Sequence, residues 1–149
     1  MIELLATLAI MGVLAMVSVP MLQLTIQRQK EQELSQALFQ IREAIDAYKR
    51  AVDQGHISLR VGESGYPPSL DALVNGIEDE KSPVRKKMFF LRKLPFNPMS
   101  SNSGLDPSKS WGLRSYESTA DNPQEGSDVF DVYCPSDKVG LNGLAYKQW

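Results

Sequence analysis

The chain has few of the residues from which reactive and metal-binding sites are usually built. Among its 149 residues there is one cysteine, Cys134, and one histidine, His56. A single cysteine excludes an internal disulfide, so the fold relies on packing, and Cys134 is predicted to be a small buried apolar residue. His56 directly follows Gly55, a predicted helix end, and no cysteine or serine elbow lies near it. We therefore expect His56 to be a loop residue and the protein not to be an enzyme.

An excess of basic residues is also absent. The formal net charge is −2, and aromatic residues make up 8% of the chain. No basic stripe with interleaved aromatic residues occurs, so a nucleic-acid surface is not expected. The Gly-Lys-Ser/Thr motif that cradles phosphates is missing as well, so any ATP-driven step needs a separate protein.

Charge is entirely missing from the run Leu4–Gln27. As a helix that rises about 1.5 Å per residue, this run is about 36 Å long, against a hydrocarbon core of about 30 Å. A cleaved secretory signal has a shorter apolar stretch, of about 7 to 15 residues, preceded by basic residues. No basic residue precedes this run, so we predict a retained membrane-spanning helix over residues 1–27.

Three residues of this segment are candidates for a specific role. Glu3 is either an interfacial residue favoured by the helix dipole or the partner of a positive group that becomes buried during assembly. Pro20 has no N–H to donate and its ring crowds the carbonyl of Met16, so a kink or local melting is expected there. Gly12 allows another backbone to approach closely.

A second helical half is predicted over residues 28–54, because apolar residues recur there at spacings of three and four. They are Leu34, Leu38, Ile41, Ile45, Tyr48 and Val52. Charged residues are expected on the other faces: Glu31, Glu33, Arg42, Glu43, Asp46, Lys49 and Arg50. The apolar stripe covers fewer than four heptads, so packing on a following domain is favoured over a coiled-coil seam.

Residues 55–149 are predicted to form a small globular head, since about 95 residues can bury a modest core. A short helix is expected over residues 69–74, and residues 88–91 are expected to face the core. Residues 93–98 should form a stiff turn around two prolines. The charge run over residues 78–87 is expected to be solvated surface.

The last part of the chain has the pattern of a small antiparallel sheet. Strands are predicted over residues 111–116 and 129–133, separated by a polar loop, with a third short strand near residues 144–149. A long helix packed on such a sheet is an α+β fold.

Residues 1–20, with Glu3 at the start and Pro20 at the end, closely resemble the N-terminal helix of the type IV pilin superfamily, which includes the pseudopilins of type II secretion systems. The head resembles the major pseudopilin in particular, in which a Leu-Pro turn precedes a short sheet ending in an Asp-x-Tyr strand. The matching segments are Lys93-Leu94-Pro95, Trp111-Gly112 and Asp131-Val132-Tyr133. In that family the glutamate stands fifth after a leader is cut off, whereas here it stands third, which points to a truncated or misassigned start.

The resemblance implies a pilin-like structural subunit that assembles into a helical filament, the pseudopilus, and supports protein export. The subunit would be a single-pass protein of the bacterial inner membrane with its head in the periplasm. Glu3 would pair with the N-terminal amine of a neighbouring subunit, and loosening around Pro20 would let the helix stretch. The implied partners are further copies of the chain, minor pseudopilins, the inner-membrane assembly platform, the prepilin peptidase with its N-terminal methylation, and a separate cytoplasmic ATPase.

Major pseudopilins often hold a calcium ion in the loop after the last strand, so the resemblance raises calcium as a candidate ligand. Calcium takes six to eight oxygen ligands. The nearby side-chain oxygens belong to Asp128, Asp131, Asp137 and Asn142. Lys138 stands beside the best of these ligands, and ordinary turn chemistry is the alternative explanation of the same residues.

Two other functions remain open from the sequence. A type IV pilus subunit would share the helix, but many type IV pilins close a C-terminal loop with a cysteine pair, which this chain lacks. A membrane-tethered periplasmic binding or enzymatic domain would use the span only as an anchor. In that case Glu3 and Pro20 would be dispensable.

Overall fold

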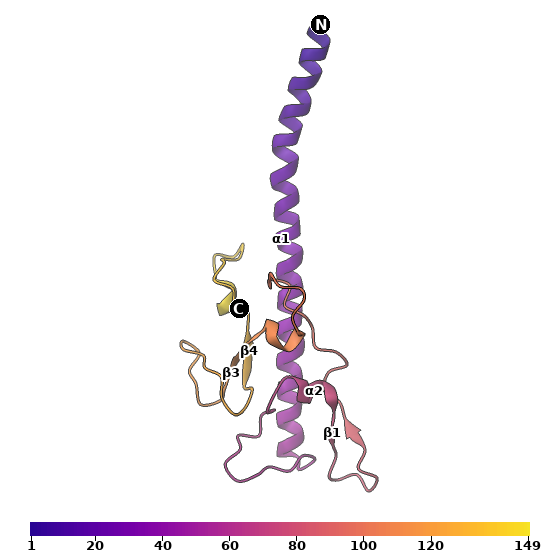
Figure 1. Ribbon diagram of the computed structural model, residues 1–149, viewed down its shortest axis with the longest axis vertical. Helices are drawn as coiled ribbons and strands as arrows, with labels where there is room; N and C mark the ends of the chain where they lie inside the picture. Colours follow the sequence, from indigo (N-terminus) through magenta and orange to yellow (C-terminus); the bar gives the residue numbers. More distant parts are fainter.

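The computed structural model describes residues 1–149, and one long helix dominates it (Figure 1). This helix, α1, runs from Ile2 to Asp53 over 52 residues. Its N-terminal half stands clear of the rest of the chain, and the head gathers around its C-terminal half. The remaining elements are short: α2 (Asp71–Asn75), β1 (Ile77–Glu78), β2 (Lys87–Met88), the 3₁₀ helix η1 (Pro107–Ser110), β3 (Gly112–Arg114), β4 (Asp131–Tyr133) and the 3₁₀ helix η2 (Tyr146–Gln148).

The predicted end of the helix at Gly55 is confirmed. Gly55 has a φ of 78°, which glycine adopts without a Cβ penalty. The Gly55 amide donates to the carbonyl of Val52, and the His56 amide donates back to the carbonyl of Ala51. These two bonds form a Schellman motif, which satisfies carbonyls that the helix end would otherwise leave free.

Pro20 lies inside α1, and the helix is continuous through it. Figure 1 shows a gently curved rod with no break in this part. The local melting expected at Pro20 is therefore absent from this structure. Loosening of this turn during assembly stays a prediction.

The core lies between one face of α1 and the head. All six stripe residues predicted to pack on the head are buried: Leu34, Leu38, Ile41, Ile45, Tyr48 and Val52. They share one cluster with head residues such as Leu73, Trp111 and Val132. Cys134 belongs to this cluster and is fully buried, as predicted.

The α+β order is confirmed, with two small antiparallel sheets. The strands predicted over 111–116 and 129–133 pair as β3 and β4, although each is shorter than expected. Their register places Leu113 opposite Val132. The β1–β2 pair was not predicted, and its connecting loop carries the charge run expected to be solvated.

One local prediction was wrong, and another holds only in part. No third strand forms near residues 144–149: the chain turns at Gly143, whose φ is 82°, makes one bridge between Val139 and Ala145, and continues into η2. The segment 88–91 does not face the core along its whole length, because Phe89 is exposed while its neighbours pack on the core. Phe89 directly follows β2, in which Lys87 is exposed and Met88 half-buried. Continuing this alternation puts Phe89 on the exposed side together with Lys87.

Candidate functional site

The most unusual surface of the molecule is the N-terminal half of α1. An 18-residue window in this helix has a mean hydropathy of 2.3, and none of that window is buried. By length and composition the helix can cross a membrane. Its exposed large side chains are Leu4, Leu5, Leu8, Ile10, Met11, Val13, Leu14, Met16, Val17, Val19, Met21, Leu22, Leu24 and Ile26. Soluble monomers rarely expose apolar patches beyond a few hundred Å², so this surface is built to be covered by lipid or protein.

The hydroxyl groups on this half of the helix bond internally. Thr7 donates to the carbonyl of Glu3 at 2.7 Å, and Thr25 donates to the carbonyl of Met21 at 3.0 Å. Ser18 donates in the same way to the carbonyl of Leu14. Such bonds to the preceding turn satisfy the hydroxyl without water, which suits an apolar surrounding.

Glu3 and Gly12 are both open to a partner. The Glu3 side chain is exposed in the first turn of α1, and it forms no hydrogen bond or ion pair within the chain. A Cβ placed on Gly12 would meet no atom within 4 Å, so nothing in this chain requires a glycine there. Any role of these two residues is therefore with another molecule or with lipid.

A buried carboxylate ties the head to α1 just beyond the apolar run. One oxygen of Glu31, Oε1, accepts hydrogen bonds from Tyr146 Oη at 2.8 Å, the Leu141 amide at 2.9 Å and Gln27 Nε2 at 3.2 Å. We call Gln27, Glu31, Leu141 and Tyr146 the Glu31 cluster. The pKa of the Tyr146 hydroxyl is raised above its ordinary value. Burial is the largest cause and the hydrogen bond to Glu31 is the second.

The placement of Glu31 on a polar face of the helix was wrong, because its side chain is only 8% exposed. The signal that could have found it is its position. Glu31 precedes Leu34 by three residues, so it continues the apolar stripe by one step. The sequence pattern does not predict the hydrogen-bond donors that compensate for burying this carboxylate.

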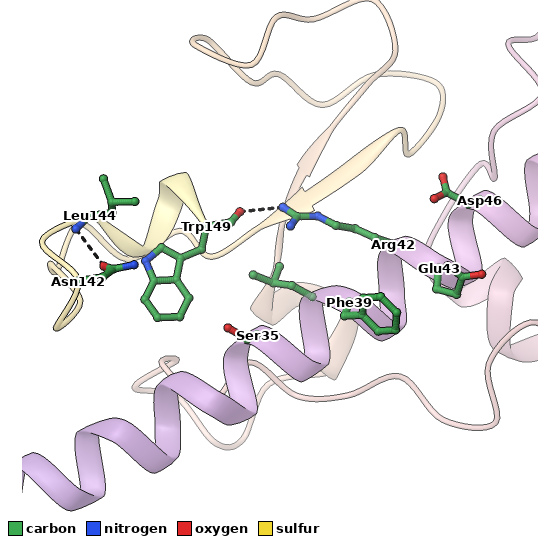
Figure 2. Close-up of a pocket in the computed structure, with 9 residues that line it drawn as sticks. Ser35, Phe39, Arg42, Glu43, Asp46, Asn142, Leu144 and Trp149 are labelled. Carbon is green, nitrogen blue, oxygen red and sulfur yellow. Dashed lines mark hydrogen bonds between the residues drawn. The ribbon is translucent and has the colours of Figure 1, made fainter.

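Arg42 is a second link between α1 and the end of the chain. Its Nε donates to Asp131 Oδ1 at 2.8 Å, and its Nη2 donates to the backbone oxygens of Val132 at 3.1 Å and Trp149 at 2.9 Å. Figure 2 shows the bond from Arg42 to Trp149. Arg42 thereby fastens β4 and the C-terminal segment to the same helix.

The four candidate calcium ligands do not form one site. Asp131 pairs with Arg42, and Asp137 pairs with Lys147 at 2.8 Å. Asp128 accepts from Ser64 Oγ and from a backbone amide, and Asn142 Oδ1 accepts from the Leu144 amide in a turn. No group of three or more His, Cys, Asp or Glu side chains is placed to hold a metal ion. These residues do not fit a calcium ion, and ordinary turn chemistry describes Asn142.

His56 follows the end of α1 as a loop residue, as predicted. Its Nδ1 lies 2.9 Å from Oδ1 of Asp79 in the loop between β1 and β2. This hydrogen bond is the main cause that lowers the pKa of the Asp79 carboxyl below its ordinary value. The pair thus connects the end of the helix to the β1–β2 loop.

Two grooves open on the head beside the C-terminal segment. One, of about 570 Å³, lies between α1 and that segment, with Phe39, Leu144 and Trp149 among its lining residues (Figure 2). The other, also about 570 Å³, is more polar and contains Arg42 and Arg114.

Comparison with known proteins identifies no relative of this chain. No family model, no curated protein and no solved structure matches it.

Proposed function

We propose that the chain is a structural subunit of a pilin-like helical filament, a type II secretion pseudopilus, which assembles from the bacterial inner membrane and supports protein export. One observation carries the proposal. A single continuous helix is fully uncovered and apolar in one half and is covered by a head in the other. A helix of this kind can exchange a lipid surrounding for a bundle of like helices without changing its fold.

The energetics favour this exchange over exposure to water. Covering a large apolar side chain is worth about 1.5 to 3 kcal/mol, and the uncovered half of α1 carries more than a dozen of them. Transfer from lipid into an equally apolar bundle nearly conserves this burial. Side-chain packing and the pairing of Glu3 then decide which arrangement of subunits forms.

Glu3 and Pro20 have distinct roles in the proposal. The free carboxylate of Glu3 pairs with the N-terminal amine of a neighbouring subunit and sets the register between the two chains. Pro20 leaves the carbonyl of Met16 without its helical donor, so the turn around Pro20 can loosen and let the helix stretch.

The cellular setting follows from the resemblance of residues 1–20 to pilins. The subunit crosses the inner membrane once and places its head in the periplasm. The prepilin peptidase processes and methylates its N-terminus, the assembly platform and a separate cytoplasmic ATPase drive polymerisation, and minor pseudopilins join the filament.

The test compares filaments from cells that express the natural gene with those from its Glu3→Ala and Glu33→Ala variants. Electron microscopy of sheared surface material reports filaments, and membrane fractionation reports insertion. Glu3→Ala should abolish filaments while leaving the protein in the membrane. Glu33 is an exposed carboxylate on the same helix, so Glu33→Ala is the matched control and should form filaments normally. Normal filaments from Glu3→Ala would refute the register role.

A membrane-tethered periplasmic binding domain is the second candidate, and the polar groove supports it. Its volume of about 570 Å³ lies in the usual range for small-molecule sites, about 300 to 1,000 Å³. This alternative predicts that the protein stays in the membrane fraction and that no filaments form from either the natural chain or Glu3→Ala. A type IV pilus subunit would give filaments like the first proposal but act in adhesion or motility.

A further inference from the structure

The part of the head nearest to the apolar half of α1 is the loop 138–145, which we call the C-terminal loop. Figure 1 shows the yellow C-terminal segment reaching toward the N-terminal end of α1 beside the helix. The Glu31 cluster fixes its height, because the Leu141 amide donates to Glu31 and Tyr146 contacts both Glu31 and Gln27.

If α1 crosses a membrane, the position of Glu31 along the helix gives the depth of the C-terminal loop relative to the bilayer. A tilted helix fits the uncharged run, about 36 Å long, into a hydrocarbon core of about 30 Å, which places Gln27 at the edge of the core and Glu31, four residues later, about 5 to 6 Å beyond it. The headgroup region extends about 5 to 8 Å beyond the hydrocarbon core on each side. The C-terminal loop is therefore held at the level of the lipid headgroups.

The loop exposes apolar side chains at this level. Val139 is 56% exposed, Leu141 is 44% exposed and Leu144 is 51% exposed. Figure 2 shows Leu144 directed away from α1. Hydrogen bonds from Gly140 to the Leu144 carbonyl and from Tyr146 to the Lys138 carbonyl hold the loop in this shape. These side chains are thus presented outward by an ordered turn.

Three basic residues near the Glu31 cluster in sequence or in the loop are exposed and form no ion pair in the chain: Arg28 and Lys30, which stand on either side of Gln29 on α1, and Lys138 at the start of the loop. Of the neighbouring carboxylates, Asp137 pairs with Lys147 and Glu31 is buried in its cluster. Glu33 is exposed and accepts a hydrogen bond from the neutral Gln29 amide, so it keeps its charge, and the three free cations outnumber it. Cations at headgroup depth attract lipid phosphates, and apolar side chains between them can enter the acyl boundary.

We propose that the C-terminal loop, together with Arg28, Lys30 and Lys138, forms a lipid-contact surface that docks the head onto an anionic membrane. The proposal rests on α1 spanning the membrane, as in the proposed function. It adds that the head is held at the bilayer by its own surface as well as by the helix. A subunit that enters a filament must release this contact.

The test measures lipid depth at single spin labels in the full chain, reconstituted in vesicles of phosphatidylethanolamine and phosphatidylglycerol. The labels are attached to Leu144→Cys, to Leu59→Cys and to Leu14→Cys. Leu59 is 51% exposed, the same as Leu144, and lies in the loop that follows the end of α1, so it is the matched control. The natural Cys134 is buried, and the chain without added cysteines measures background labelling.

The expected result is a several-fold higher ratio of oxygen accessibility to water-soluble nickel accessibility at Leu144→Cys than at Leu59→Cys. Equal, water-like ratios at these two labels, with Leu14→Cys in lipid, would overturn the lipid contact and leave the span intact. Protection of Leu144→Cys from both reagents would also overturn it and indicate that a second copy of the chain covers the loop. A water-like ratio at Leu14→Cys would overturn the span itself.

Discussion

At the scale of single residues, the most informative side chain is Glu31, a charged residue type at a buried position. Glu31 occupies an apolar stripe position, yet three donors converge on one of its oxygens. Removing one partner of a buried charged hydrogen bond is more destabilising than the bond itself is favourable. Loss of the Tyr146 proton would place a phenolate beside the Glu31 carboxylate, so one of the three bonds of the Glu31 cluster depends on that proton.

This condition predicts a loss of stability in alkali. The pKa of Tyr146 is raised above 10.0, so between the unfolded and folded pKa values the folded chain binds more protons. Stability is then fully present below about pH 10 and falls as the pH rises. Denaturant unfolding of the full chain in detergent, measured from neutral pH upward, should show this fall, and Tyr146→Phe should make it shallower.

The slope should be reduced rather than abolished by Tyr146→Phe, because burial also raises the pKa values of Tyr48 and Tyr66. An identical slope in Tyr146→Phe and the natural chain would contradict the assigned role.

At the scale of elements, predictions from the sequence were most reliable for long periodic patterns and for turns that require a particular residue such as glycine. The apolar stripe and Gly55 predicted the packed face and the end of α1, because helical periodicity and the Schellman motif are local rules. Residues 128, 131, 137 and 142 were grouped as oxygen ligands by proximity in sequence, and the structure gives them separate partners. Long-range choices such as Arg42 to Asp131 cannot be read from spacing.

The short sheets show the same limit. Strands over 111–116 and 129–133 were predicted from β-branched and aromatic residues, but the extra strand near 144–149 failed because Gly143 turns the chain first. The β1–β2 pair escaped prediction because two-residue strands carry no periodic signal.

One close contact in β3 gives a prediction at this scale. Gly112 pairs with Tyr133, and a Cβ on Gly112 would clash with the tyrosine ring. Gly112→Ala should therefore force the ring or the strand to move, which overpacking data put at about 1 to 3 kcal/mol of stability. Denaturant unfolding measures this loss. Gly104→Ala is the control, since its Cβ would meet nothing closer than 3.6 Å. Equal stability of the two variants would show that Tyr133 moves aside freely.

At the scale of the whole molecule, one helix serves two surroundings. Residues 4–27 carry no charge, and the charged residues that begin at Arg28 lead directly into the part of the helix that the head covers. This division was predictable because hydropathy is a sum over many residues. The position of the head close to the membrane boundary could not be predicted from the sequence, because this position depends on the buried hydrogen bonds of Glu31.

The division predicts that a charge in the first half of α1 prevents insertion, whereas the same charge in the head does not. Leu14 lies near the middle of the uncharged run, where an arginine is unfavourable by about 2.5 to 3.5 kcal/mol, while each Leu, Ile or Val contributes only about −0.3 to −0.6 kcal/mol. Leu14→Arg should shift the insertion equilibrium by on the order of 100-fold, because about 1.4 kcal/mol is tenfold. Flotation with vesicles after cell-free synthesis measures the inserted fraction.

Leu59→Arg is the matched control, because it adds the same charge to an exposed leucine of the head. It should float like the natural chain while Leu14→Arg remains with the unbound protein. If Leu14→Arg floated as well as Leu59→Arg, α1 would have to lie on the membrane surface, where an arginine can reach water. The filament proposal requires that Leu14→Arg float less than Leu59→Arg. In that proposal the helix passes from the hydrocarbon core into a helix bundle, so it must first enter the hydrocarbon core.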